Sequence, residues 1–213
     1  MYVLTSRCVA RSGIYPNLLI MLSAFLVLGL MVALLSALSA KRHRARTALL
    51  NGNLVGETSP VPLLTAAMVL GIGLGGFIDG IFFHQIFQVH EMLSNKIPST
   101  DYVGKSVNMF WDGIFHFFCL MVVLTGIILL WKLLQRKNTE NSGKLLSGGL
   151  VLGWGLFNIV EGIINHHILK LHNVIEISEN PDTGNFIFLG ISALILIAGA
   201  LLLRGHRGHR IGP

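Results

Sequence analysis

The sequence predicts an all-α fold, a polytopic membrane bundle of five transmembrane helices. Of the 213 residues, 53% are hydrophobic and only 12% are charged, which is far from the average composition of soluble domains. A helix crosses the hydrocarbon core of a bilayer with about 20 apolar residues. Five segments reach that length, near residues 17–40, 62–90, 109–132, 145–171 and 185–203. They take more than half of the chain and leave no room for a soluble domain.

The first apolar segment is interpreted as a retained anchor helix. Its apolar run, Leu18 to Ala40, is longer than a signal-peptide core of roughly 7–15 residues. No small-residue cleavage site follows it, but four basic residues do: Lys41, Arg42, Arg44 and Arg46. We therefore divide the chain into residues 1–61, with the N-terminal tail, the anchor helix and a basic cytoplasmic linker, and residues 62–213, a four-helix membrane domain.

The distribution of charge predicts the orientation of the bundle. Lys and Arg gather after the first segment, between the third and fourth, and in the C-terminal tail, whereas the loop after the fourth carries Glu176, Glu179 and Asp182 and no basic residue. The positive-inside rule then places the N-terminus outside and the C-terminus inside, although Arg7 and Arg11 in the N-terminal tail oppose it. The formal net charge of +6 is thus a topology signal, and we expect no nucleic-acid partner.

Two apolar segments carry the same pattern of an acid, a glycine and two histidines. The residues are Asp79, Gly80, His84 and His90 in the second segment and Glu161, Gly162, His166 and His172 in the fourth. Both steps have the same length in the two copies, five residues from acid to histidine and six between the histidines. Because ionisable side chains in a bilayer are costly, this repetition predicts a metal or cofactor site.

The third segment adds two further candidates, Asp112 and His116. They are four residues apart, so a helix places them on one face, about 6 Å apart along its axis. The third helix runs against the second and fourth, and all three segments therefore bring their polar residues to the outer half of the membrane. The candidate metal ligands and their immediate supports are Asp79, His84, His90, Asp112, His116, Glu161, His166 and His172.

An internal repeat extends upstream of the histidines. Residues 69–73, Val-Leu-Gly-Ile-Gly, match residues 151–155, Val-Leu-Gly-Trp-Gly, at the same offset of 82. We expect a parallel repeat of two helical hairpins, 62–132 and 145–203, related by an axis along the membrane normal. The fifth helix has no counterpart of Asp112 or His116, and the glycines would let the repeated helices pack closely.

Helix geometry leaves the number of centres open. On a straight α-helix, Asp79 and His84 are about 140° apart, and Asp79 and His90 share a face but are separated by about 16 Å. Two neighbouring centres would explain the pattern, and so would a π-bulge near Gly80 and Gly162. We favour more than one centre, or one centre with acids that orient the histidines.

Imidazole and carboxylate ligands suit several transition metals, among which we favour copper or iron, with zinc as a further candidate. A haem clamped by His84 and His166 stays open. The leading hypothesis is a metal-binding membrane protein in redox chemistry or copper handling, in one version a metal-dependent membrane oxidoreductase. The alternatives are a zinc-dependent intramembrane hydrolase, a transporter or proton relay without metal, and a structural subunit held together by polar contacts.

Three strings, GFIDGIFFHQIFQVH, FWDGIFHFF and GWGLFNIVEGIINHHILKLHNV, resemble the signature of a bacterial family of predicted membrane proteins, domain of unknown function 2243. The likeness runs from about Leu63 to Leu203. It implies a multi-pass protein of the bacterial inner membrane, surrounded by the lipid bilayer. The resemblance does not imply a particular activity. Members are often encoded beside assembly proteins of cytochrome oxidase. That gene neighbourhood implies a function in copper handling or in the respiratory chain, with a respiratory oxidase or its assembly factors as partners. Whether the protein forms an oligomer stays open.

Overall fold

The computed structural model describes residues 59–136 and 141–204. Within these ranges the chain is helical and has no strand. The elements are α2 (Val61–Ile78), the π-helix η1 (Asp79–Ile86), α3 (Tyr102–Leu134), α4 (Gly143–Glu161), the π-helix η2 (Gly162–Ile168) and α5 (Pro181–Leu203). The expected anchor helix at 17–40 lies outside the described residues, and the division of the chain near residue 61 stays a prediction.

Four helices of the described ranges are long and apolar enough to cross a membrane, which makes this a multi-pass membrane protein. They correspond to the second to fifth expected segments, with shifted ends. The third helix begins at Tyr102 rather than near 109, because Asp101 caps it by accepting a hydrogen bond from the Gly104 N–H at 2.7 Å. The second and fourth end at Ile86 and Ile168, earlier than the expected 90 and 171.

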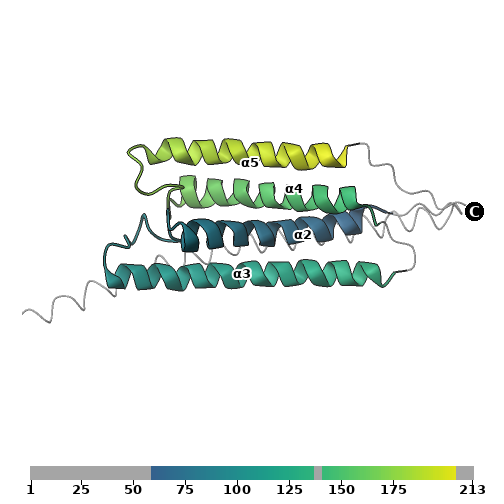
Figure 1. Cartoon of the computed structure of the whole chain (residues 1–213), viewed down its shortest axis with the longest axis horizontal. Helices are drawn as coiled ribbons and strands as arrows, with labels where there is room; N and C mark the ends of the chain where they lie inside the picture. Colours follow the sequence, from purple (N-terminus) through teal and green to yellow (C-terminus); the bar gives the residue numbers. More distant parts are fainter. Residues whose placement is uncertain (1–58, 137–140, 205–213) are drawn as a thin grey trace, which may run out of the picture.

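The helices lie side by side in the order α3, α2, α4, α5 (Figure 1). The two central helices, α2 and α4, run in the same direction, and α3 and α5 return against them (Figure 1). Both outer helices expose large apolar side chains, among them Ile127 and Trp131 on α3 and Leu194 and Ile197 on α5. Such surfaces suit contact with lipid.

Glycines allow α2 and α4 to approach closely. A Cβ atom on Gly71 would collide with the carbonyl group of Leu150, and one on Gly153 would collide with the carbonyl group of Met68. The two contacts are equivalent in the repeat, because Gly153 lies 82 positions after Gly71 and Leu150 lies 82 positions after Met68. Backbone contact of this kind is how small residues hold helices together in bilayers.

Both central helices change to π-helix where the acids and histidines begin. In each, a backbone N–H bonds the carbonyl five residues earlier, Phe87 to Phe82 at 2.8 Å and Leu169 to Ile164 at 2.7 Å. Because an i→i+5 bond closes one turn of a π-helix, an acid and a histidine five residues apart reach the same face. The 140° separation expected of a straight helix is wrong here, and the π-helical alternative is confirmed.

The chain folds back directly after each π-helix. Gln88 and Lys170 adopt left-handed backbone conformations, with φ of 48° and 49°, which are uncommon for residues other than glycine. The fold-back is closed by bonds from Val89 N–H to the Phe83 carbonyl at 3.1 Å and from Leu171 N–H to the Asn165 carbonyl at 2.8 Å. As a result the second histidine of each pattern returns over the end of its own helix.

Candidate metal centre

The acids and histidines of both repeated patterns meet in one buried cluster at the end of the bundle where η1 and η2 lie. The cluster has six residues, and each of them is at most 7% exposed. The imidazole rings pack on one another, with the rings of His90 and His172 stacked at a centroid distance of 4.7 Å. The members of this cluster, called the six-residue cluster below, are Asp79, His84, His90, Glu161, His166 and His172.

Each carboxylate lies beside the two histidines of its own pattern. Asp79 Oδ2 is 3.4 Å from His84 Nε2, and Asp79 Oδ1 is 4.0 Å from His90 Nε2. Glu161 Oε1 is 3.0 Å from His166 Nε2 and 3.2 Å from His172 Nε2. The separation of about 16 Å that a straight helix gives Asp79 and His90 is therefore wrong, because the helix ends at Ile86 and the chain reverses.

His90 and His172 are held by crossed hydrogen bonds between the two loops that follow the π-helices. The ring Nδ1–H of His90 donates to the carbonyl of Val174 at 2.8 Å, and that of His172 donates to the carbonyl of Met92 at 3.1 Å. A carbonyl group only accepts, so Nδ1 carries the proton and Nε2 presents a lone pair. Each histidine thus anchors the loop that carries the other.

The protonation of His90 suits a metal ligand. Burial disfavours the charged ring and holds the pKa of His90 well below its usual value, and the nearby His172 and His84 act in the same direction. The ring is therefore neutral near pH 7, which is the form that binds a metal.

Asp112 supports His84 from the side away from the cluster. Its Oδ1 accepts from His84 Nδ1–H at 2.7 Å and from the Met92 N–H at 3.0 Å, and its Oδ2 accepts from Gln85 Nε2 at 3.3 Å. A carboxylate on the second nitrogen of a metal-ligating histidine fixes the ring and raises its basicity. Gln85 was not among the residues singled out from the sequence, where its position next to His84 was the only signal.

His116 lies apart from the six-residue cluster. Its Nδ1–H donates to the backbone carbonyl of Asp112 at 2.7 Å, and its ring stacks on Phe77 at 6.0 Å. The absence of a side chain at Gly80 makes room for it, since a Cβ atom there would lie 2.6 Å from His116 Nε2. The structure therefore places His116 against the outside of η1 and not among the four clustered histidines.

The cluster contains two groups of ligand atoms that could hold a metal ion. One consists of His84, His90 and His172 and the other of Glu161, His166 and His172, and within each group the atoms lie within 4.8 Å of one another. The Nε2 atoms of all four histidines are buried and make no well-oriented hydrogen bond, although a carboxylate oxygen lies 3.0–4.0 Å from each of them. Metal–ligand bonds of about 2.0–2.1 Å hold neighbouring ligands about 3–4 Å apart, so the observed acid–histidine distances fit a transition metal.

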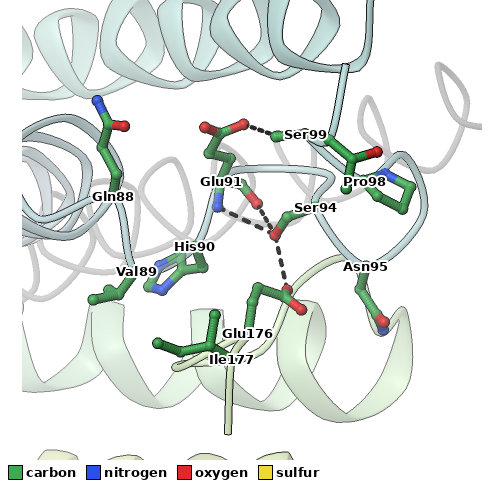
Figure 2. A pocket seen from close by; sticks show the side chains of 11 residues that line it. Gln88, Val89, His90, Glu91, Ser94, Asn95, Pro98, Ser99, Glu176 and Ile177 are labelled. Atoms are coloured by element: carbon green, nitrogen blue, oxygen red, sulfur yellow. Dashed lines mark hydrogen bonds between the residues drawn. The ribbon is translucent and has the colours of Figure 1, made fainter.

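A cavity of about 430 Å³ reaches the cluster at the same end of the bundle. His90 forms part of its wall, between Val89 and Glu91 (Figure 2). The buried Glu91 carboxylate contacts Lys105. It also accepts a hydrogen bond from Ser99, while Ser94 donates to Glu176 Oε1 at 2.8 Å (Figure 2). Sequence reasoning missed Glu91, whose position directly after His90 was the available signal.

Neither a search of curated proteins nor a search of solved structures returned a match. A sequence model for a family described as predicted membrane protein (DUF2243) matches residues 66–206, which is most of the chain and includes both π-helices and the whole six-residue cluster. The chain therefore belongs to the DUF2243 family of predicted membrane proteins.

Proposed function

We propose that this protein is an integral membrane metalloprotein whose six-residue cluster binds a transition metal for redox chemistry or copper handling. One observation carries the proposal. Four buried histidine Nε2 atoms, which make no well-oriented hydrogen bond, converge with two buried carboxylates.

The alternative of a purely structural polar clamp would require protons on these buried histidine Nε2 atoms. The Nδ1–H groups of His84, His90 and His172 are already donated to Asp112 and to two carbonyl groups. Their Nε2 atoms therefore point lone pairs at carboxylate oxygens and at one another, which is repulsive unless a cation lies between them. Protons or a metal ion can supply that charge, and leaving buried polar atoms unpaired costs about 1–3 kcal/mol each.

The donor set favours iron, with copper as the alternative. The two groups of ligand atoms contain imidazole and carboxylate only, and two histidines with one carboxylate are typical of non-haem iron sites. Cys119 is buried in α3, where its Sγ lies against Gly76, and it belongs to neither group. The cluster thus lacks the thiolate that copper(I) and iron–sulfur centres prefer.

A proton relay across the membrane is less well supported. In the described residues, every buried acidic or histidine side chain lies in the end of the bundle that holds the cluster or in the loop next to it. The opposite halves of the four helices bury no acid, lysine, arginine or histidine. A path for protons would need such groups to continue through the bilayer.

The orientation expected from the sequence places the cluster near the outer face of the inner membrane. Lys132, Arg136, Lys144 and Arg204 stand at the far ends of the described helices, which supports a cytoplasmic location for those ends. The cavity beside His90 then opens toward the outside. A metal ion or a small reactant would reach the cluster from that side.

The decisive experiment is metal analysis together with an absorption spectrum of the full-length protein, purified in detergent without chelators. Stoichiometric iron or copper supports the proposal. The double variant His84→Ala/His166→Ala should retain no metal, whereas His206→Ala, a histidine of the C-terminal tail, should retain the wild-type amount.

Other results would redirect the assignment. Zinc alone would favour the hydrolase, and a Soret band would identify His84 and His166 as haem ligands. Protein that is metal-free and takes up no metal on titration would refute the proposal.

A further inference from the structure

We infer that the six-residue cluster is a dinuclear centre in which each repeated pattern supplies one half-site. The half-sites are Asp79 with His84 and His90, and Glu161 with His166 and His172. This inference rests on the proposed function, because it requires that the cluster bind metal. It adds the number of ions and the assignment of each side chain to one of them.

A single ion cannot use all six side chains. Bonds of about 2.1 Å keep any two ligands of one ion within about 4.2 Å of each other. The ligand atoms instead form two groups, and only His172 belongs to both.

His172 can serve only one ion at a time. Its Nδ1–H is donated to the Met92 carbonyl, so a single lone pair on Nε2 remains. That atom is 3.2 Å from Glu161 Oε1, which assigns it to the half-site of its own pattern. In the other half-site, Asp79 is the third ligand in place of His172, with one oxygen toward His84 and the other toward His90.

The surrounding backbone is duplicated in the same way. The crossed bonds join His90 to Val174 and His172 to Met92, and each carbonyl belongs to the residue two positions after the opposite histidine. The left-handed residues Gln88 and Lys170 are also 82 positions apart. Two copies of one local structure present two copies of one ligand set.

The ligand set and the spacing suit a pair of first-row transition ions. Two histidines and one carboxylate leave positions open on a non-haem iron ion. In two-metal sites the ions are about 3.5–4 Å apart. The stacked rings of His90 and His172, with centroids 4.7 Å apart, place the two half-sites side by side.

The test counts ions in the full-length protein. Detergent-purified protein is stripped with a chelator and reloaded with ferrous iron without oxygen, after which bound iron and protein are quantified. We expect two iron ions per chain, about one in His90→Ala and in His172→Ala, and two in the control His167→Ala. His167 is a matched control because it follows His166 in the same π-helix but packs on Phe186 at 4.9 Å.

A second measurement needs no variant. Wild-type protein loaded with manganese(II) should give the electron paramagnetic resonance spectrum of two spin-coupled ions. One ion per chain at saturating iron would overturn the inference and leave the proposed function standing. No bound ion would overturn both. Two magnetically isolated manganese ions would place the second one outside the cluster and would also overturn the inference.

Discussion

At the residue scale, the two nitrogens of each imidazole have different tasks. In His84, His90 and His172 the Nδ1–H is donated to a fixed acceptor at 2.7, 2.8 and 3.1 Å, which leaves Nε2 to face the centre of the cluster. His166 differs, because its Nδ1 is buried without a hydrogen-bond partner. The two half-sites therefore offer similar ligands that are not held equally firmly.

Removing the charge of Asp112 should weaken metal binding without removing a ligand. In Asp112→Asn the amide oxygen can still accept from His84, but the ring loses the nearby negative charge that makes it a stronger ligand. We expect an affinity about 10–100-fold lower, measured by competition with a chromophoric chelator. Asp101→Asn is the matched control, since this exposed residue caps the same helix and asparagine caps as well. An unchanged affinity in Asp112→Asn would show that this carboxylate has no part in the site.

At the element scale, the two π-helices convert a spacing of five residues into a shared face. They lie where α2 and α4 reach the loops that lead to α3 and α5, and glycine stands at the second position of η1 and the first of η2. A Cβ atom on Gly80 would meet His116 on α3, and one on Gly162 would meet Leu189 on α5 at 2.9 Å. The same glycines therefore let each π-helix lie close to its outer helix.

The glycine contacts between α2 and α4 should set the stability of the bundle. In Gly71→Ala the new methyl group would collide with the Leu150 carbonyl. This carbonyl is part of the helix backbone, which cannot move aside as the end of a flexible side chain can. We expect a destabilisation of about 1–3 kcal/mol, seen as a lower thermal unfolding temperature in detergent. Gly113→Ala is the control, because nothing lies within 4 Å of its Cβ position. Equal unfolding temperatures for the two variants would contradict the close packing of α2 and α4.

The loop between η1 and α3 controls access to the cluster in our proposal. Thr100 lines the cavity beside His90 and is exposed. Thr100→Trp should fill part of the cavity and slow metal uptake, while the final metal content stays unchanged. The rate of uptake is measured by stopped-flow mixing of metal-free protein with the metal. Thr100→Val keeps the shape and should take up metal at the wild-type rate. If the tryptophan variant loads equally fast, metal enters by another path.

At the scale of the whole molecule, the bundle buries its acids and histidines at one end, while Lys132, Arg136, Lys144 and Arg204 lie at the other. The outer helices α3 and α5 expose apolar side chains along their length, while α2 and α4 lie between them (Figure 1). Assembly of the site therefore requires both hairpins, since each contributes one carboxylate and two histidines.

The orientation of the bundle can be tested with single cysteines in a Cys8→Ser background, where the remaining Cys119 is buried. A membrane-impermeant maleimide applied to intact cells should label Thr100→Cys, which lies at the end with the cluster. It should label Gln135→Cys, at the opposite end of α3, only after the membrane is permeabilised. The reverse pattern would place the cluster on the cytoplasmic side.

The amino-acid sequence by itself determined the class of the protein and the residue types of its candidate site. Long apolar segments specify membrane helices whatever their neighbours are, because an unpaired backbone cannot cross a bilayer. The cost of burying ionisable groups marks Asp79, His84, Glu161 and His166 as unusual. The offset of 82 was also visible without coordinates.

Only the tertiary structure decided how these residues meet. The sequence allowed either separate centres or a π-bulge, because spacing along one helix fixes neither its local hydrogen-bond register nor its rotation against other helices. Nothing in the sequence marks Gln88 and Lys170 for left-handed backbone, and their fold-back is stabilised by bonds between loops about 80 residues apart, such as His90 to Val174. Long-range contacts of this kind turn an eleven-residue spacing that a straight helix would stretch to about 16 Å into the 4.0 Å between Asp79 and His90.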